Sequence, residues 1–271
     1  MTTALHLAAF AGYLVAWLLQ FISFRSSEPE QGDAPLWLAG AATVSHAFGL
    51  AAFSLANATL PLVGLGPASS TLALAVAIGF LAVAGRRELR PTGLFVLPIV
   101  LFLLAQALAV GFAHAQLQTA FAGAWFVFHV TSVFLGYAAL LIASVAAIMF
   151  LLQFRSLTKK QFGSVFRSFP SLDALDRLRR LGLAIGLAVL TIGLLAGWSF
   201  TLTFGRGLAL SDPEVLLGVL TWVVFLAALT IRSRAGGTDH KAAIATTLAF
   251  GTVAVAFLVL RAVTASTGFF L

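Results

Sequence analysis

Eight apolar stretches separated by short polar segments dominate this sequence of 271 residues. Hydrophobic residues make up 61% of the chain and charged residues only 9%, more apolar surface than a soluble domain of this length can bury. A run of about 20 apolar residues matches the hydrocarbon thickness of a bilayer, roughly 30 Å. Backbone polar groups inside lipid must be satisfied within the span, so these stretches are expected to be helices. The expected spans are Leu5–Phe24, Leu36–Leu60, Ser70–Gly85, Gly93–His114, Trp125–Gln153, Leu181–Thr203, Val215–Ile231 and Ala242–Ala262.

The fold class is therefore all-α: a polytopic membrane protein built as one bundle of eight transmembrane helices. The third span is short for a bilayer, and we expect it to be tilted, offset or partly re-entrant. A cleavable signal peptide is not expected, because the residues before the first apolar run carry no basic side chain.

Basic residues are concentrated in alternate loops. The loops after the first, third, fifth and seventh spans hold 14 of the 16 Lys and Arg residues, which leaves Arg206 and Arg261 on the other side. The positive-inside rule then places these four loops in the cytoplasm and both termini outside. This topology explains the net charge of +7, and no nucleic-acid partner is expected.

The residue types exclude several kinds of chemistry. The chain has no cysteine, so it has no disulfide, thiolate metal site or cysteine nucleophile. Its nine acidic residues all fall in loops or at span ends, so no span carries an acid that would indicate a proton or cation relay. We expect the protein not to be an enzyme. Gln106, inside the fourth span, is expected to hydrogen-bond to a neighbouring helix.

The longest cytoplasmic loop, residues 154–180, contains an amphipathic segment. Ser171 is a suitable N-cap, and Asp173 and Asp176 lie in the first turns, where the helix dipole favours anions. Three leucines recur at helical spacing: Leu172, Leu175 and Leu178. We expect an interfacial helix on the inner leaflet that leads into the sixth span. A docking surface for a partner is the alternative.

The histidines are the remaining candidates for a functional site. His46 lies near the middle of the second span, where an imidazole needs a partner or a ligand. His129 lies about one turn inside the fifth span, among aromatic residues that include Trp125. Their depths differ by only about 10 Å at a rise of about 1.5 Å per residue. They suit either ligation of one metal or haem iron from opposite faces, or two unrelated structural roles. The other histidines have simpler explanations at the outer interface or in a cytoplasmic loop: His6, His114 and His240.

Several motifs occur in a recognisable order. They are Ser45–Ala47, Val96–Ile99, Trp125–Leu140, a basic loop, Phe169–Leu178, Gly186–Gly197, Asp212–Glu214 and Thr221-Trp222. Together they resemble the haem-handling cytochrome c assembly family, in the HemX/YpjD branch related to CcsA and CcmC. The resemblance covers nearly the whole chain.

The resemblance implies roles for particular residues. His129 occupies the place of an external haem ligand, and Asp212 begins the Asp-Pro-Glu that ends the family's haem-cradling external motif. The tryptophans of that motif are missing from residues 205–211. Thr230 replaces the histidine that the family has near the end of the seventh span, and residues 262–271 contain no histidine, although the family has one after the eighth span. These departures favour the smaller branch, in which only the histidines of the second and fifth spans are expected.

The function implied by the resemblance is that of a haem chaperone or transporter in cytochrome c assembly or haem homeostasis. The haem would be b-type and non-covalent, with His129 and His46 as axial ligands and His114, Asp212 and Trp125 as further contacts. The expected partners are haem, the lipid bilayer of a bacterial inner membrane, and cytochrome c assembly proteins or a cytosolic haem-synthesis enzyme. Two alternatives stay open: a non-catalytic regulator of a tetrapyrrole-synthesis enzyme, and a small-molecule permease.

Overall fold

The computed structural model describes residues 1–26, 32–112, 123–160, 163–203, 213–235 and 239–267. These residues form helices, and no strand occurs within them. The elements are α1 Thr2–Arg25, α2 Ala34–Asn57, α3 Leu65–Ala84, η1 Arg87–Thr92 (a 3-10 helix), α4 Gly93–Val110, α5 Ala124–Thr158, α6 Ser164–Ser168, α7 Leu172–Thr203, α8 Pro213–Ala235 and α9 Asp239–Thr267.

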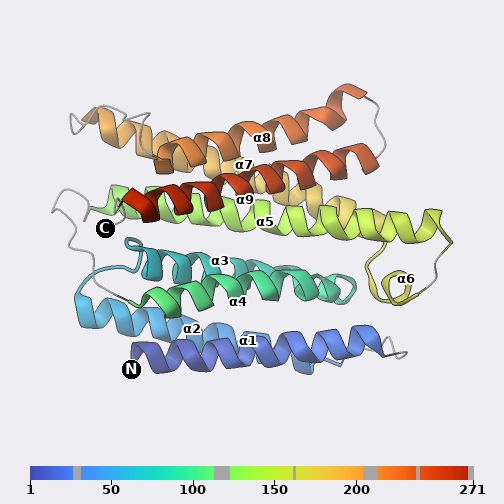
Figure 1. The fold of residues 1–271 in the computed structure, drawn as a ribbon, viewed down its shortest axis with the longest axis horizontal. Coiled ribbons are helices and arrows are strands. Elements are labelled where there is room, and N and C mark those ends of the chain that lie inside the picture. Colours follow the sequence, from blue (N-terminus) through green and yellow to red (C-terminus); the bar gives the residue numbers. More distant parts are fainter. Residues whose placement is uncertain (27–31, 113–122, 161–162, 204–212, 236–238, 268–271) are drawn as a thin grey trace.

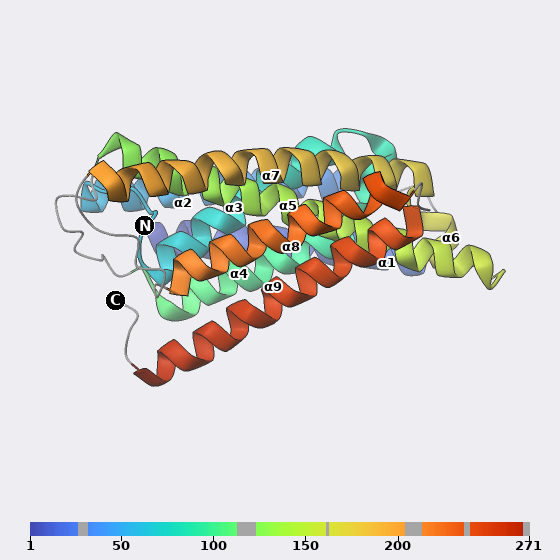
Figure 2. The same cartoon turned by 90° about the horizontal axis from the view of Figure 1, so that it is seen from above.

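The expected all-α polytopic bundle is confirmed. Within the described residues, 7 helices are long and apolar enough to cross a membrane, and the apolar part of α8, Val215–Ile231, is shorter. The long helices run side by side along the long axis of the molecule (Figure 1). The start of α1 and the end of α9 lie at the same end of the bundle (Figures 1 and 2).

The helices pack as two groups that meet in the middle. In the first group α1 packs on α2 and α4, and α3 packs on α4. In the second group α5 packs on α7 and α9, and α8 packs on α9. The contact of α3 with α5 joins the two groups, and the main apolar core continues across it from Phe80 on α3 to Met149 on α5.

The third helix is longer than the sequence predicted. It begins at Leu65 and has 20 residues, about 30 Å of helix, which is enough to cross a bilayer. Pro67 lies in its first turn, where the missing N–H of proline costs no hydrogen bond. Ser70, expected to begin the span, is instead fully buried inside it.

Helices take up most of the loop predicted for residues 154–180. Helix α5 continues to Thr158 and α7 begins at Leu172, with the short α6 between them. The predicted cap is present, because the backbone N–H of Ala174 donates to the Ser171 hydroxyl at 3.2 Å. The leucine-bearing segment is the first part of α7, continuous with the membrane helix, and Leu175 is fully buried.

A buried ion pair lies in the first turns of α7. Asp176 and Arg179 are 2% and 1% exposed, and the Arg179 Nε and Nη2 atoms donate to Asp176 Oδ1 at 3.1 and 2.5 Å. Arg180 Nη1 lies 3.1 Å from the other carboxylate oxygen, and Thr246 on α9 lies 3.5 Å from Arg179 Nη1. The pair therefore ties α7 to α9 near the basic end of the bundle.

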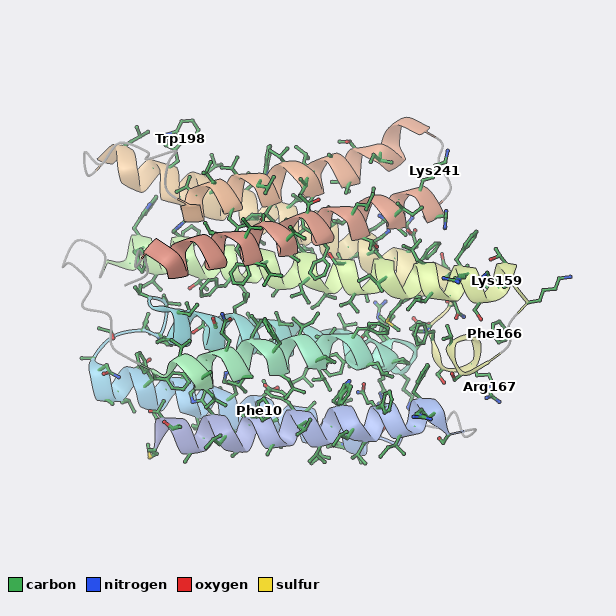
Figure 3. The ribbon with its side chains drawn as sticks, viewed as in Figure 1. Phe10, Lys159, Phe166, Arg167, Trp198 and Lys241 are labelled. Carbon is green, nitrogen blue, oxygen red and sulfur yellow. The ribbon has the colours of Figure 1, made fainter. Side chains whose placement is uncertain are left out.

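The side chains mark the two ends of the bundle. Lys159, Arg167 and Lys241 lie at one end, and Trp198 lies at the opposite end (Figure 3). This segregation is what the positive-inside rule expects of a chain whose four basic loops share one side of a membrane.

The absence of cysteine makes the topology directly testable. We expect a membrane-impermeant maleimide to label a Leu60→Cys variant in intact cells, because this half-exposed residue (50%) lies at the end opposite the basic loops. A Lys160→Cys variant should be labelled only after permeabilisation. Labelling of both positions in intact cells would contradict the orientation.

The buried ion pair gives a stability prediction. Asp176→Asn leaves Arg179 buried without its counter-charge, so we expect a loss of roughly 3–5 kcal/mol of unfolding free energy in detergent. Asp173→Asn is the matched control, because the Asp173–Arg177 pair is exposed and such pairs contribute about 0–1 kcal/mol. Equal losses in the two variants would show that burial does not decide the effect.

Candidate functional site

A buried polar cluster connects α1, α2 and α3. His6, Tyr13, His46 and Ser70 are each 0% exposed, and Thr43 is 7% exposed. The two imidazole rings are edge-on to each other, with centroids 5.3 Å apart and an interplanar angle of 71°. Buried polar groups of this kind need internal partners, and the cluster supplies them.

One serine hydroxyl lies between the two histidines. Ser70 Oγ is 3.0 Å from His6 Nε2 and 2.8 Å from His46 Nε2. His6 Nδ1 lies 2.8 Å from the Thr2 carbonyl oxygen, which can only accept, so Nδ1 carries the proton in the neutral ring. His6 Nε2 is then an acceptor for the Ser70 hydroxyl, and Ser70 Oγ accepts from the N–H at His46 Nε2. The protons are therefore donated in sequence from His46 to Ser70, from Ser70 to His6, and from His6 to the Thr2 carbonyl.

Tyr13 completes the cluster on the other side of His46. Its hydroxyl donates to Thr43 Oγ1 at 3.1 Å and lies 3.5 Å from His46 Nδ1. Thr43 in turn donates to the Ala39 carbonyl at 2.8 Å. His46 Nε2 thus has a partner in Ser70, whereas its Nδ1 faces the Tyr13 oxygen, whose single proton goes to Thr43.

A glycine on α2 makes room for the His6 ring. A Cβ atom at Gly49 would lie 2.7 Å from His6 Nδ1 and Cε1, so α2 can approach α1 here only with glycine. On another side Phe112 contacts the ring at a centroid distance of 4.2 Å. Contrary to the sequence prediction, His6 is therefore fully buried among three helices and does not lie at the outer interface. Depth along the spans gives no signal for the pair, because His6 lies in the first turns of α1 whereas His46 lies near the middle of α2.

His129 lies in a second site, where α5 packs on α7. Its Nδ1 is 2.7 Å from the carbonyl oxygen of Gly193. Because that oxygen only accepts, the neutral ring carries its proton on Nδ1 and has a lone pair on Nε2. No described residue hydrogen-bonds to this Nε2. Histidine ligands of metals commonly have this arrangement, with one nitrogen held by a carbonyl and the other available.

The outer end of α7 fixes the orientation of the His129 ring. A Cβ at Gly197 would lie 2.6 Å from His129 Cε1, so the ring sits directly against this glycine. One turn earlier on α5, Trp125 Nε1 donates to the Ala196 carbonyl at 2.9 Å. Both aromatic side chains are thus hydrogen-bonded to the backbone of α7, while Trp125 and Phe128 stay about half exposed (49% and 51%).

The structure does not bring the two predicted ligands together. His46 contacts residues of α1 and α3, whereas His129 contacts α7.

Two other predicted site residues, His114 and Asp212, lie outside the described residues. Helix α8 begins at Pro213, two residues before the expected Val215. The expected interhelical bond of Gln106 is confirmed, since Ser69 on α3 donates to it at 3.3 Å.

The donor set suits a haem iron better than a bare metal ion. The described residues contain no cluster of three or more His, Asp or Glu side chains that could hold a metal ion. A haem iron needs only one or two axial ligands from the protein, with apolar surroundings for the ring. His129, beside Trp125 and Phe128, supplies both features.

A bundle of membrane-length helices defines a polytopic membrane protein. The sequence profile of the cytochrome c assembly protein family matches residues 38–266. The chain belongs to this family.

Curated relatives agree with that assignment. The chain is 28% identical over 159 residues to the cytochrome c biogenesis protein CcsA of Guillardia theta, covering 53% of each chain. It is 32% identical over 126 residues to CcsA of Chlamydomonas reinhardtii, covering 46% of this chain and 35% of the relative. CcsA of Prochlorococcus marinus (strain MIT 9312) is 28% identical over 174 residues, with 53% of each chain covered. The chain thus spans about half the length of these relatives, or less.

The serine between the histidines gives a prediction for the buried cluster. Ser70→Ala leaves the N–H of His46 and the Nε2 of His6 without their shared partner. We expect a loss of about 1–3 kcal/mol of unfolding free energy, measured in detergent. Ser54→Ala is the control, because the Ser54 hydroxyl donates to the carbonyl of Leu50 in its own helix. An unchanged stability of Ser70→Ala would mean that the hydroxyl does not hold the two rings.

Proposed function

We propose that this chain binds b-type haem non-covalently in the membrane, as a haem chaperone or transporter in cytochrome c assembly or haem homeostasis. The observation that carries the proposal is the geometry of His129, whose Nδ1 is held by Gly193 O while Nε2 is available. Membership of the cytochrome c assembly family and the CcsA relatives support it. Bound haem would supply a redox-active iron and two propionates. The protein's part would be to bind, orient and shield it.

His129 is the first axial ligand in this proposal. The carbonyl of Gly193 fixes the tautomer, and Gly197 fixes the ring position, so Nε2 has one direction in which to bind iron. Trp125, hydrogen-bonded to α7 one turn away, is proposed as a wall of the haem slot. His114 and Asp212 remain proposed outer contacts, on the family resemblance alone.

His46 is the second proposed ligand, and its neighbours set the conditions for binding. Its Nε2 donates to Ser70, so iron at that atom requires Ser70 to turn away and the proton to reside on Nδ1, beside the Tyr13 hydroxyl. Helices α2 and α5 both pack on α3. Ligation of one iron by both histidines therefore requires these helices to rearrange. For this reason His129 is proposed as the primary ligand and His46 as the second.

We also propose the cellular setting. The basic end would face the cytoplasm of a bacterium, and His129 would lie near the outer face of its inner membrane. The partners would be haem and other cytochrome c assembly proteins, or a cytosolic haem-synthesis enzyme. No residue is assigned a catalytic step.

The test is a haem titration of the detergent-purified protein, followed by Soret absorbance. We expect His129→Ala to weaken haem binding by at least about tenfold, and His129→Gly with added imidazole to recover the axial-ligand spectrum. Gly197→Ala should also weaken binding, because its methyl group occupies the position of the ring. His240→Ala is the control histidine, since it packs against Phe154 at the basic end.

Two results would overturn the proposal. One is a double His46→Ala, His129→Ala variant with unchanged haem affinity and spectrum. The other is a wild-type protein that takes up no haem; a specific cytosolic partner would then favour the regulator, and haem-independent substrate flux would favour the permease.

A further inference from the structure

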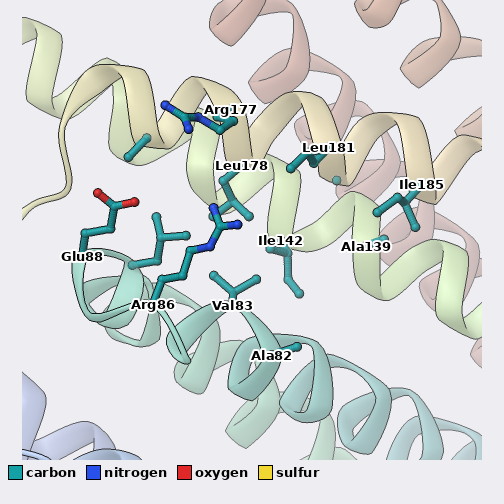
Figure 4. A pocket seen from close by; sticks show the side chains of 13 residues that line it. Ala82, Val83, Arg86, Glu88, Ala139, Ile142, Arg177, Leu178, Leu181 and Ile185 are labelled. Carbon is teal, nitrogen blue, oxygen red and sulfur yellow. The ribbon is translucent and has the colours of Figure 1, made fainter.

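A groove opens at the basic end of the bundle, between the end of α3 and the neighbouring parts of α5 and α7 (Figure 4). Its volume is about 280 Å³. The walls are mostly apolar and include Ala82, Val83, Ile142, Leu178, Leu181 and Ile185. The groove lies where the two groups of helices meet, so both contribute to it.

The apolar walls extend to the lipid-facing surface. Leu181 and Ile185 on α7 are 51% and 55% exposed although they line the groove. Both residues lie within the membrane-length part of α7. A hydrocarbon chain can therefore reach the groove sideways from the bilayer, without crossing water.

Cationic side chains lie at the mouth. Figure 4 shows Arg86 extending from the end of α3 toward Leu178 on α7, whereas the Arg177 side chain, on the same turn, lies along α7 and does not point toward Arg86. In the described part of the chain, Arg86 has no carboxylate oxygen within 4.0 Å. Among the described residues, the one salt-bridge partner of Arg177 is the 75% exposed Asp173, and an exposed pair of this kind is weak and exchangeable. The lining itself contains two arginines and one acid, Glu88, so it favours an anion.

We propose that this groove binds an anionic phospholipid, with its phosphate between Arg86 and Arg177 and one acyl chain against Leu181 and Ile185. A basic pocket between membrane helices at the cytoplasmic side is suited to anionic lipid headgroups. Arginine forms paired, charge-assisted hydrogen bonds with phosphate oxygens. The apolar walls explain why the ligand is an amphiphile of the bilayer and not a free anion.

The site is separate from the proposed haem site. Arg177 and Gly197 are 20 positions apart on α7, which is about 30 Å of helix. A substitution in the groove can therefore abolish lipid binding without changing haem binding, and a substitution at His129 can do the reverse.

The experiment measures phosphatidylglycerol retained by the full chain after detergent purification, using native mass spectrometry. We expect the double variant Arg86→Gln, Arg177→Gln to retain at least about tenfold less lipid than the wild type, because each arginine supplies a charge-assisted bond. Arg87→Gln is the matched control, since its side chain is 82% exposed and lines no part of the groove.

A second variant tests the apolar part with both arginines intact. Ala82→Phe puts a ring into the groove and should also expel the lipid, whereas Ala51→Phe, at an exposed position on α2, should not. Each variant is first shown to keep the wild-type helical circular dichroism and thermal midpoint. The proposal would be overturned by equal loss in Arg87→Gln, by full retention in Ala82→Phe, by equal retention of phosphatidylethanolamine, or by displacement of the lipid with inorganic phosphate.

Discussion

The close contact of α5 with α7 is the constraint on which the rest of the structure depends. Glycines 182, 186, 193 and 197 lie along one side of α7, and a Cβ at any of them would come within 2.9 Å of an α5 side chain. In lipid, where helices gain no hydrophobic energy by association, such small residues allow backbones to approach and dispersion contacts to form. The same approach brings the Gly193 carbonyl within 2.7 Å of His129, so the packing and the candidate ligand geometry have one cause.

The histidines illustrate two ways to accommodate an imidazole in a membrane. His6 and His46 are fully buried, and they satisfy each other through Ser70 in a bond chain that begins at the Thr2 carbonyl. His129 has one nitrogen bonded to backbone and one without a partner among the described residues. The first arrangement gives both nitrogens of His6 and the Nε2 of His46 a partner, and it stabilises the packing of three helices. The second has an unused acceptor atom, which is what a ligand site requires.

Much of the fold could be predicted from the sequence because lipid leaves few alternatives. Apolar runs located most helices to within about five residues. Helix α3 begins earlier than expected because proline is compatible with a first turn, and α7 begins at Leu172, in the segment expected to lead into the span from Leu181. The Ser171 cap and the Gln106 bond were also predictable, since both are local or need only some neighbour. The His6–Ser70–His46 cluster was not, because it depends on which helices are adjacent and how each is rotated. The Asp176–Arg179 pair was missed for a related reason, since charge in a short basic segment resembles a solvated loop.

Helix length has a mechanical consequence. Helices α5 and α7 have 35 and 32 residues, about 50 Å each, and so exceed the hydrocarbon thickness of roughly 30 Å by several turns. Their packed pair is one stiff rod, with Arg177 near one end and His129 near the other. A tilt of about 5° about one end of such a rod displaces the other by roughly 4 Å, more than the length of a hydrogen bond. A force on the basic loops that tilted this helix pair would therefore move the His129 imidazole at its other end.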